Sequence, residues 1–104
     1  MSDLYDKRYK SGTKKYIEAA KEPMAEYKKY QKSLLDNSPF DKKTTELILL
    51  ASSCAIQCSY CIDTHSKRAK MAGATDKDLA YAVTLAASVK HGATVSYGVN
   101  ALSE

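Results

Sequence analysis

Near the middle of the chain lies the sequence CAIQCSYCIDTH, residues 54–65, which separates two helical patterns. Before it, Asp41 stands where an N-cap belongs, ahead of the run 42–52, which is apolar almost all round. After it, a second helix is expected to begin near Cys58 and to end before Gly73, a typical C′ glycine. The cysteine-rich stretch is therefore expected to join two packed helices.

The segments on either side also carry helical patterns. Residues 13–35 are rich in Lys, Glu and Ala, and their apolar side chains recur at three- and four-residue steps. Pro23 interrupts this stripe and predicts either two helices or one bent helix. Thr75–Asp78 resembles a capping box that opens a further helix, expected to end by Gly92. The tail 93–102 gives a weaker helical signal.

The fold expected from these patterns is a single all-α domain over residues 1–104, a bundle of five to six helices. Residues 1–12 are polar and close on Ser11-Gly12, so we expect a loose leader there. The branched residues of 42–52 would also suit a buried strand, but the length of the run and the alanine and serines that follow favour a helix.

Composition and charge exclude several classes of protein. Hydrophobic residues make up 44% and charged residues 27% of the chain, which is ordinary for a globular protein. No run reaches the roughly 20 apolar residues that cross a bilayer, and no secretory signal is visible, so we expect a cytoplasmic protein without a membrane partner. The net charge is +4, but acidic residues are interleaved with the basic ones, which does not indicate nucleic-acid binding. In the cytoplasm, cysteines favour thiol catalysis or metal binding over a disulfide scaffold.

A metal centre is one interpretation of the cysteines. On a continuous helix Cys54 and His65 would lie about 16 Å apart along the axis, too far to share one zinc ion. A break near residues 56–57 would relax this objection, but no second ligand pair exists, so no metal site is predicted. Cysteines at 54, 58 and 61 also match the spacing of enzymes that bind a four-iron cluster and a sulfonium cofactor. Those enzymes need a partial α/β barrel, and such barrels run to about 200 residues or more.

A dithiol redox centre is the interpretation we prefer. Cys58 and Cys61 fall in the first turn of the expected helix, where their sulfurs are within bonding reach and the helix N-terminus favours a thiolate. His65 follows Cys61 by four residues, so the two share a face and the imidazole can take the thiol proton. This contact nominates Cys61 as the activated sulfur and Cys58 as its partner. The helix terminus alone would favour Cys58, and we give the histidine more weight.

Three other residues have simpler interpretations. Cys54 is expected to pack as a small apolar residue on the buried helix. Glu46, taken alone, is a solvated first-turn glutamate that the helix dipole favours. His91 is expected near a helix C-terminus, facing solvent or a subunit contact.

A family resemblance rests on Glu46, the motif Cys58-Ser59-Tyr60-Cys61, His65 and the Ala72–Thr75 turn. Together they resemble the carboxymuconolactone decarboxylase superfamily, specifically its alkylhydroperoxidase D-like branch, over about residues 40–102. The resemblance implies an all-α fold whose chains form homo-oligomers, either trimers or hexamers. Tyr60 is a departure, because peroxidases of this branch often carry a histidine there, and its absence removes one proton acceptor.

The resemblance also implies a thiol peroxidase that reduces hydrogen peroxide or organic hydroperoxides and binds no cofactor. Cys61 would be the peroxidatic cysteine and Cys58 the resolving one, with His65 and Glu46 as a proton relay. An external dithiol, a dihydrolipoyl group or a thioredoxin-like protein, would reduce the disulfide. The alternatives are a disulfide reductase or redox relay without peroxidase activity, and a non-catalytic metal-binding oligomer.

Overall fold

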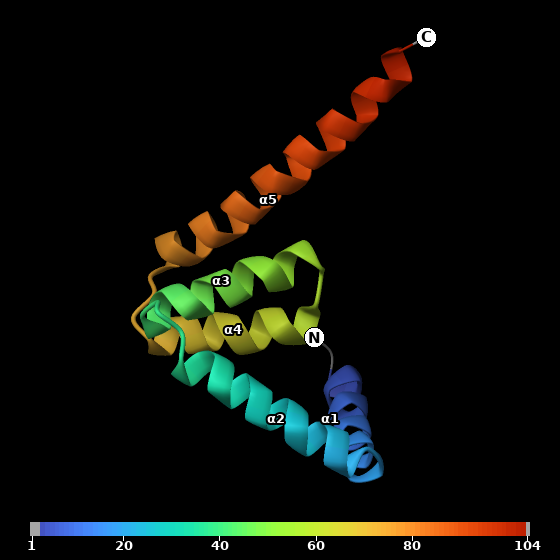
Figure 1. The fold of residues 1–104 in the computed structure, drawn as a ribbon, viewed down its shortest axis with the longest axis vertical. Coiled ribbons are helices and arrows are strands. Elements are labelled where there is room, and N and C mark those ends of the chain that lie inside the picture. The colour runs from blue at the N-terminus through green and yellow to red at the C-terminus, as the bar shows by residue number, and fades with distance from the viewer. Residues whose placement is uncertain (1–2, 104) are drawn as a thin grey trace. The chain divides into compact units, whose positions relative to one another are not determined.

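The computed structural model describes residues 3–103, and these residues form helices without any strand (Figure 1). The elements in chain order are α1 (Asp3–Ala19), α2 (Lys21–Asp36), α3 (Lys42–Ala55), α4 (Ser59–Met71), α5 (Asp76–Gly98) and the short 3₁₀ helix η1 (Val99–Leu102). The predicted all-α fold is confirmed. The chain divides into two compact units, one up to Ser38 and one from Pro39 onward. This division leaves the single-domain prediction for residues 1–104 untested.

The first unit consists of α1 and α2. Pro23 lies in the first turn of α2, where its missing N–H is not needed by the helix, so the interruption separates two helices. The loose leader predicted over residues 1–12 is wrong for residues 3–12, which belong to α1, while residues 1 and 2 lie outside the described part. Gly12 does not end this helix, because a glycine in a helix interior costs only about 1 kcal/mol.

The second unit is built around α3, which packs against both α4 and α5. In Figure 1, α4 runs back along α3 in the opposite direction, and α5 then runs in the same general direction as α3. Each of these helices contributes one buried apolar residue, Leu50 from α3, Ala69 from α4 and Ala82 from α5. The run that was expected to be buried all round is buried on one side only, because Ile48 is 46% exposed.

The last helix is longer than the sequence predicted. We expected it to end by Gly92, but α5 continues through this residue to Gly98. A single glycine leaves the helical hydrogen bonds available, so it is a weak terminator without a following breaker. Every residue from 91 to 103 is exposed, and this part of α5 extends beyond α3 (Figure 1).

A Schellman motif ends α3. The N–H of Gln57 donates to the carbonyl of Cys54 at 3.1 Å, and the N–H of Cys58 donates to the carbonyl of Ser53 at 3.0 Å. The motif needs a left-handed residue after the helix, and Gln57 takes that position with φ of 60°. The turn satisfies two terminal carbonyls and reverses the chain within three residues.

The same motif ends α4. Gly73, with φ of 96°, donates to the carbonyl of Lys70, and Ala74 donates to that of Ala69, both at 2.9 Å. The C′ glycine predicted from the sequence is confirmed. Because both connections are this short, α4 and α5 each return to pack against α3.

The starts of α3 and α5 carry the predicted caps. The carboxylate of Asp41 accepts the N–H of Thr44 at 2.7 Å, and this hydrogen bond lowers the pKa of Asp41 from its ordinary value. Thr75 and Asp78 form the capping box, in which the N–H of Thr75 lowers the pKa of the Asp78 carboxyl. Local sequence signals therefore fix where both helices begin.

Replacing Gly73 and Gly92 by alanine is expected to change stability in opposite directions. A Cβ at either position meets nothing within 4 Å, so only backbone conformation matters. Gly73→Ala places an L-residue at a left-handed position and should cost about 1–2 kcal/mol, whereas Gly92→Ala should gain about 0.5–1 kcal/mol. Urea unfolding at a fixed protein concentration measures both. Equal changes of the same sign would contradict the Schellman assignment.

Candidate functional site

Cys58 ends one helix and begins the next. Its N–H completes the Schellman motif of α3, and its sulfur accepts the backbone N–H of Cys61 at 3.2 Å, which makes Cys58 the N-cap of α4. A sulfur in this position lies at the positive end of the dipole of α4. The predicted helix start near Cys58 is confirmed.

Cys58 and Cys61 form a disulfide across the first turn of α4. Their Cα atoms are 5.2 Å apart, within the usual range for a disulfide, and both residues are half-buried. The expected bonding reach of the two sulfurs is therefore confirmed. Cys54 is a free, half-buried thiol on the last turn of α3. Cys54 is therefore not part of the disulfide pair.

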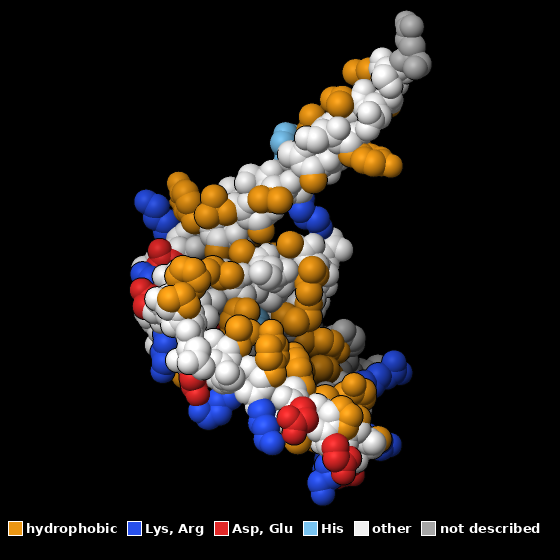
Figure 2. Space-filling model, viewed as in Figure 1, with side chains coloured by type: hydrophobic (Ala, Val, Ile, Leu, Met, Phe, Trp, Pro, Cys, Tyr) orange, Lys and Arg blue, Asp and Glu red, His pale blue; other side chains and the backbone are white. Residues whose placement is uncertain are grey.

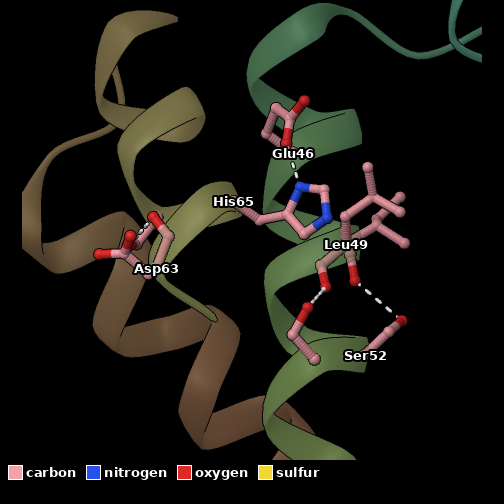
Figure 3. A network of polar contacts seen from close by, with 8 residues as sticks. Glu46, Leu49, Ser52, Asp63 and His65 are labelled. Carbon is pink, nitrogen blue, oxygen red and sulfur yellow. Dashed lines mark hydrogen bonds and ion pairs between the residues drawn. The ribbon is translucent and has the colours of Figure 1, made fainter. Parts of the chain in front are cut away.

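Glu46 and His65 join α3 to α4. Nδ1 of His65 lies 2.7 Å from Oε2 of Glu46, and the two side chains are only 19% and 11% exposed respectively. Figure 3 shows the imidazole reaching from α4 to the carboxylate on α3. A carboxylate buried to this extent needs such a partner. The simpler interpretation of Glu46 as a solvated first-turn residue is wrong.

The contact with Glu46 fixes how the imidazole can act. Because Nδ1 faces Glu46, Nε2 is the ring nitrogen left for another partner. His65 lies one helical turn after Cys61 on α4, so the two side chains project from the same face. Within residues 3–103 the structure records no hydrogen bond from His65 to either sulfur. The two pairs are thus neighbours along α4 without a direct bond between them.

Two further residues shape the site, and the sequence did not single them out. Gln57 holds the left-handed position immediately before Cys58. Lys90, on α5, donates from Nζ to the carbonyl of Ala55 at 3.0 Å, at the end of α3. A glycine at 57 would have signalled the turn, whereas a glutamine does not. Nothing in the sequence marks an exposed lysine 35 residues away as a partner of α3.

Two other polar residues, His91 and Asp63, take no part in these contacts. His91 is exposed on α5. Asp63 forms an ion pair with Lys67 at 3.0 Å and points away from α3 in Figure 3. Across the described residues no group of three or more His, Cys, Asp and Glu side chains could hold a metal ion, and no helix there could cross a membrane. The chemistry available is that of a cysteine pair and a buried histidine–carboxylate pair.

Fold and site together define a small all-α protein with a redox-capable cysteine pair. The profile of the carboxymuconolactone decarboxylase family matches residues 21–104, so the chain belongs to that family, as the resemblance implied. Some members of the family are alkylhydroperoxidase-like proteins and some are decarboxylases.

Two relatives show how far the likeness extends. Uncharacterized protein 4 in the cox locus of Paracoccus denitrificans is 33% identical over 72 residues, which are 69% of this chain and 65% of that protein. The match thus spans slightly less than two thirds of the relative. A crystal structure of a Methanobacterium thermoautotrophicum protein superposes with a TM-score of 0.79 at 25% identity, covering 86% of this chain and 99% of that one. The helical arrangement is therefore shared with a solved structure.

The Glu46–His65 pair is expected to stabilise the packing of α4 on α3. A double-mutant cycle of Glu46→Ala and His65→Ala should give a coupling energy of about 1–3 kcal/mol, because either single change leaves a buried polar partner unsatisfied. Urea unfolding at neutral pH supplies the four free energies. The same cycle on Asp63 and Lys67 is the control, and as an exposed pair it should give less than about 0.5 kcal/mol. Additive effects at Glu46 and His65 would contradict this prediction.

Proposed function

We propose that this protein is a thiol-dependent peroxidase that reduces hydrogen peroxide or organic hydroperoxides through a Cys58–Cys61 disulfide cycle. One observation carries the proposal: the cysteine pair lies at the start of α4, one turn before a histidine whose orientation a buried carboxylate fixes. Membership of a family that includes alkylhydroperoxidase-like proteins supports it. A cycle of this kind suits the cytoplasm, where disulfides are reduced again.

The first step of the proposed reaction is attack on peroxide. Nε2 of His65 takes the proton of the Cys61 thiol, directly or through a water, while Glu46 holds Nδ1 and stabilises the imidazolium. The thiolate of Cys61 attacks the terminal oxygen of the peroxide, and the O–O bond breaks. The imidazolium returns its proton to the leaving oxygen. The products are a sulfenic acid on Cys61 and an alcohol, or water when the substrate is hydrogen peroxide.

The second step closes the disulfide. The thiol of Cys58 attacks the sulfenic sulfur of Cys61, forming the S–S bond and releasing water. The short Cα separation of 5.2 Å lets this happen without unfolding the first turn of α4. An external dithiol then reduces the disulfide, supplying two electrons and two protons and becoming a disulfide itself. We propose a dihydrolipoyl group or a thioredoxin-like protein as this donor, with no cofactor bound to the chain.

One observation favours a second candidate, a disulfide reductase or redox relay. The sulfur that receives the N–H of Cys61 is that of Cys58, so the helix terminus favours the thiolate of Cys58 over that of Cys61. A first cysteine that readily forms a thiolate suits exchange with another disulfide, a reaction that requires no peroxide. The histidine favours Cys61 and the cap favours Cys58, so the two functions predict different reactive sulfurs.

We further propose that copies of the chain associate through the end of α5 and η1 into a homo-oligomer, a trimer or a hexamer. Residues 91–103 are all exposed, and the segment 94–103 has no charged side chain. Figure 2 shows apolar side chains along this part of α5. The large ones are Val95, Tyr97, Val99 and Leu102, each more than half exposed. An apolar surface of this kind is typical of a protein–protein contact. Light scattering of the full chain tests it, and a monomer would contradict it.

Peroxide consumption with dihydrolipoamide or dithiothreitol as the donor tests the proposed peroxidase. Cys61→Ser and Cys58→Ser should abolish turnover, because each removes one partner of the disulfide. His65→Gln should lower the rate by about 10²- to 10⁴-fold, the usual effect of losing a general base. Cys54→Ser is the matched control and should leave turnover within about twofold, since this thiol is outside the pair.

Two outcomes would contradict the peroxidase. Undiminished turnover in Cys61→Ser would exclude Cys61 as the sulfur that attacks peroxide. Rapid reduction of a disulfide substrate by the wild-type dithiol, without any peroxide consumption, would favour the redox relay instead.

A further inference from the structure

The segment that carries the cysteines has no charge of its own. Between Glu46 and Asp63 no residue is charged, and each of these two is already paired within the α3–α4 unit. The hydrogen bond from Lys90 to the carbonyl of Ala55 brings an ammonium group to this segment from α5. Ala55 is the last residue of α3, three positions before Cys58. A cation is thus bonded to the backbone three residues before the first cysteine of the pair.

The hydrogen bond of Lys90 completes the end of α3. The Schellman motif uses the carbonyls of Ser53 and Cys54, and the carbonyl of Ala55 is the next in line. Lys90 donates to it at 3.0 Å. An ammonium at a helix C-terminus is also favoured by the helix dipole. The turn that makes Cys58 the N-cap of α4 is therefore stabilised from α5 as well as from its own backbone.

A second polar contact fixes the register of α5 on α3. Lys43, in the first turn of α3, lies 3.6 Å from the carboxylate of Asp78, in the first turn of α5. Asp78 precedes Lys90 by twelve residues, the same interval that separates Lys43 from Ala55. The two helices therefore run in the same direction and in step, with one lysine contact at each end. Only the Lys90 contact is next to the cysteines.

We propose that Lys90 is a positioning residue for the dithiol: it holds the α3–α4 turn in the shape that places Cys58 on the end of α4, and its charge favours the reduced, thiolate form. This inference rests on the dithiol cycle of the proposed function. The reaction that it affects is the exchange of the protein disulfide with a donor dithiol, in which two electrons and two protons pass from the donor to the protein. Loss of Lys90 makes the Cys58–Cys61 disulfide harder to reduce.

The test is the redox equilibrium of the full chain in mixtures of reduced and oxidised dithiothreitol, with free thiols alkylated and counted by mass spectrometry. Lys90→Met should lower the equilibrium constant for reduction by about 3- to 10-fold, since it removes both the charge and the donor. Lys90→Arg keeps both and should stay within about twofold of the wild type. The ultraviolet absorbance of the thiolate should appear at higher pH in Lys90→Met than in the wild type.

Lys43→Met is the matched control, because it removes the same charge from the other end of the same helix pair. It should leave the redox equilibrium unchanged. An unchanged equilibrium in Lys90→Met, or an equal shift in Lys43→Met, would overturn the proposal. If Lys90→Met does not fold, Lys90→Gln takes its place: it removes the charge and keeps a donor, so it should still lower the equilibrium constant, by less than Lys90→Met, and an unchanged constant would overturn the proposal. No peroxide is used, so loss of the peroxidase hypothesis and loss of this one give separate results.

Discussion

The structure of the site depends on two hydrogen bonds made by a single residue, Cys58. Its N–H closes the end of α3 on the carbonyl of Ser53, and its sulfur opens α4 by accepting the N–H of Cys61. A reversal this tight makes α4 run back along α3, so residues 19 apart in the sequence, Glu46 and His65, come within 2.7 Å. Within α4, the second cysteine lies one turn before the imidazole. Fold and chemistry therefore originate in one turn.

Electrostatics divides the site into two parts. The Glu46–His65 pair is buried and orients one ring nitrogen, whereas the cysteine segment is half-buried at its cysteines and carries no charge of its own. In the described residues its surroundings supply the α4 terminus and the ammonium of Lys90. In the proposed dithiol cycle both favour a thiolate, and the cap acts on Cys58 while the histidine lies nearer to Cys61 in the helix. In the proposed cycle, this division lets one sulfur react with peroxide and the other exchange with a donor dithiol.

Local signals account for the parts of this structure that the sequence predicted. Asp41, the Thr75 capping box, Gly73 and the cysteine spacing each act within about one helical turn, so their patterns are visible without the fold. The family resemblance rested on the spacing of Glu46, the cysteines and His65, although their pairing across two helices could be seen only in three dimensions. The features that the sequence did not predict either run against local propensity or depend on residues far apart in the chain. Gln57 adopts a conformation that favours glycine, and α5 passes through Gly92, where propensity indicates otherwise. Lys90 acts over 35 residues, and no local pattern records such a contact.

The most direct test of this account is a map of the cysteines after the reduced protein has met one equivalent of hydrogen peroxide. Free thiols are alkylated, and the chain is cleaved after Tyr60, which separates Cys58 from Cys61 unless a disulfide joins them. Two peptides linked through these sulfurs are expected, with the alkyl group on Cys54 alone. A bridge that includes Cys54, or three alkylated cysteines after peroxide has been consumed, would contradict this expectation.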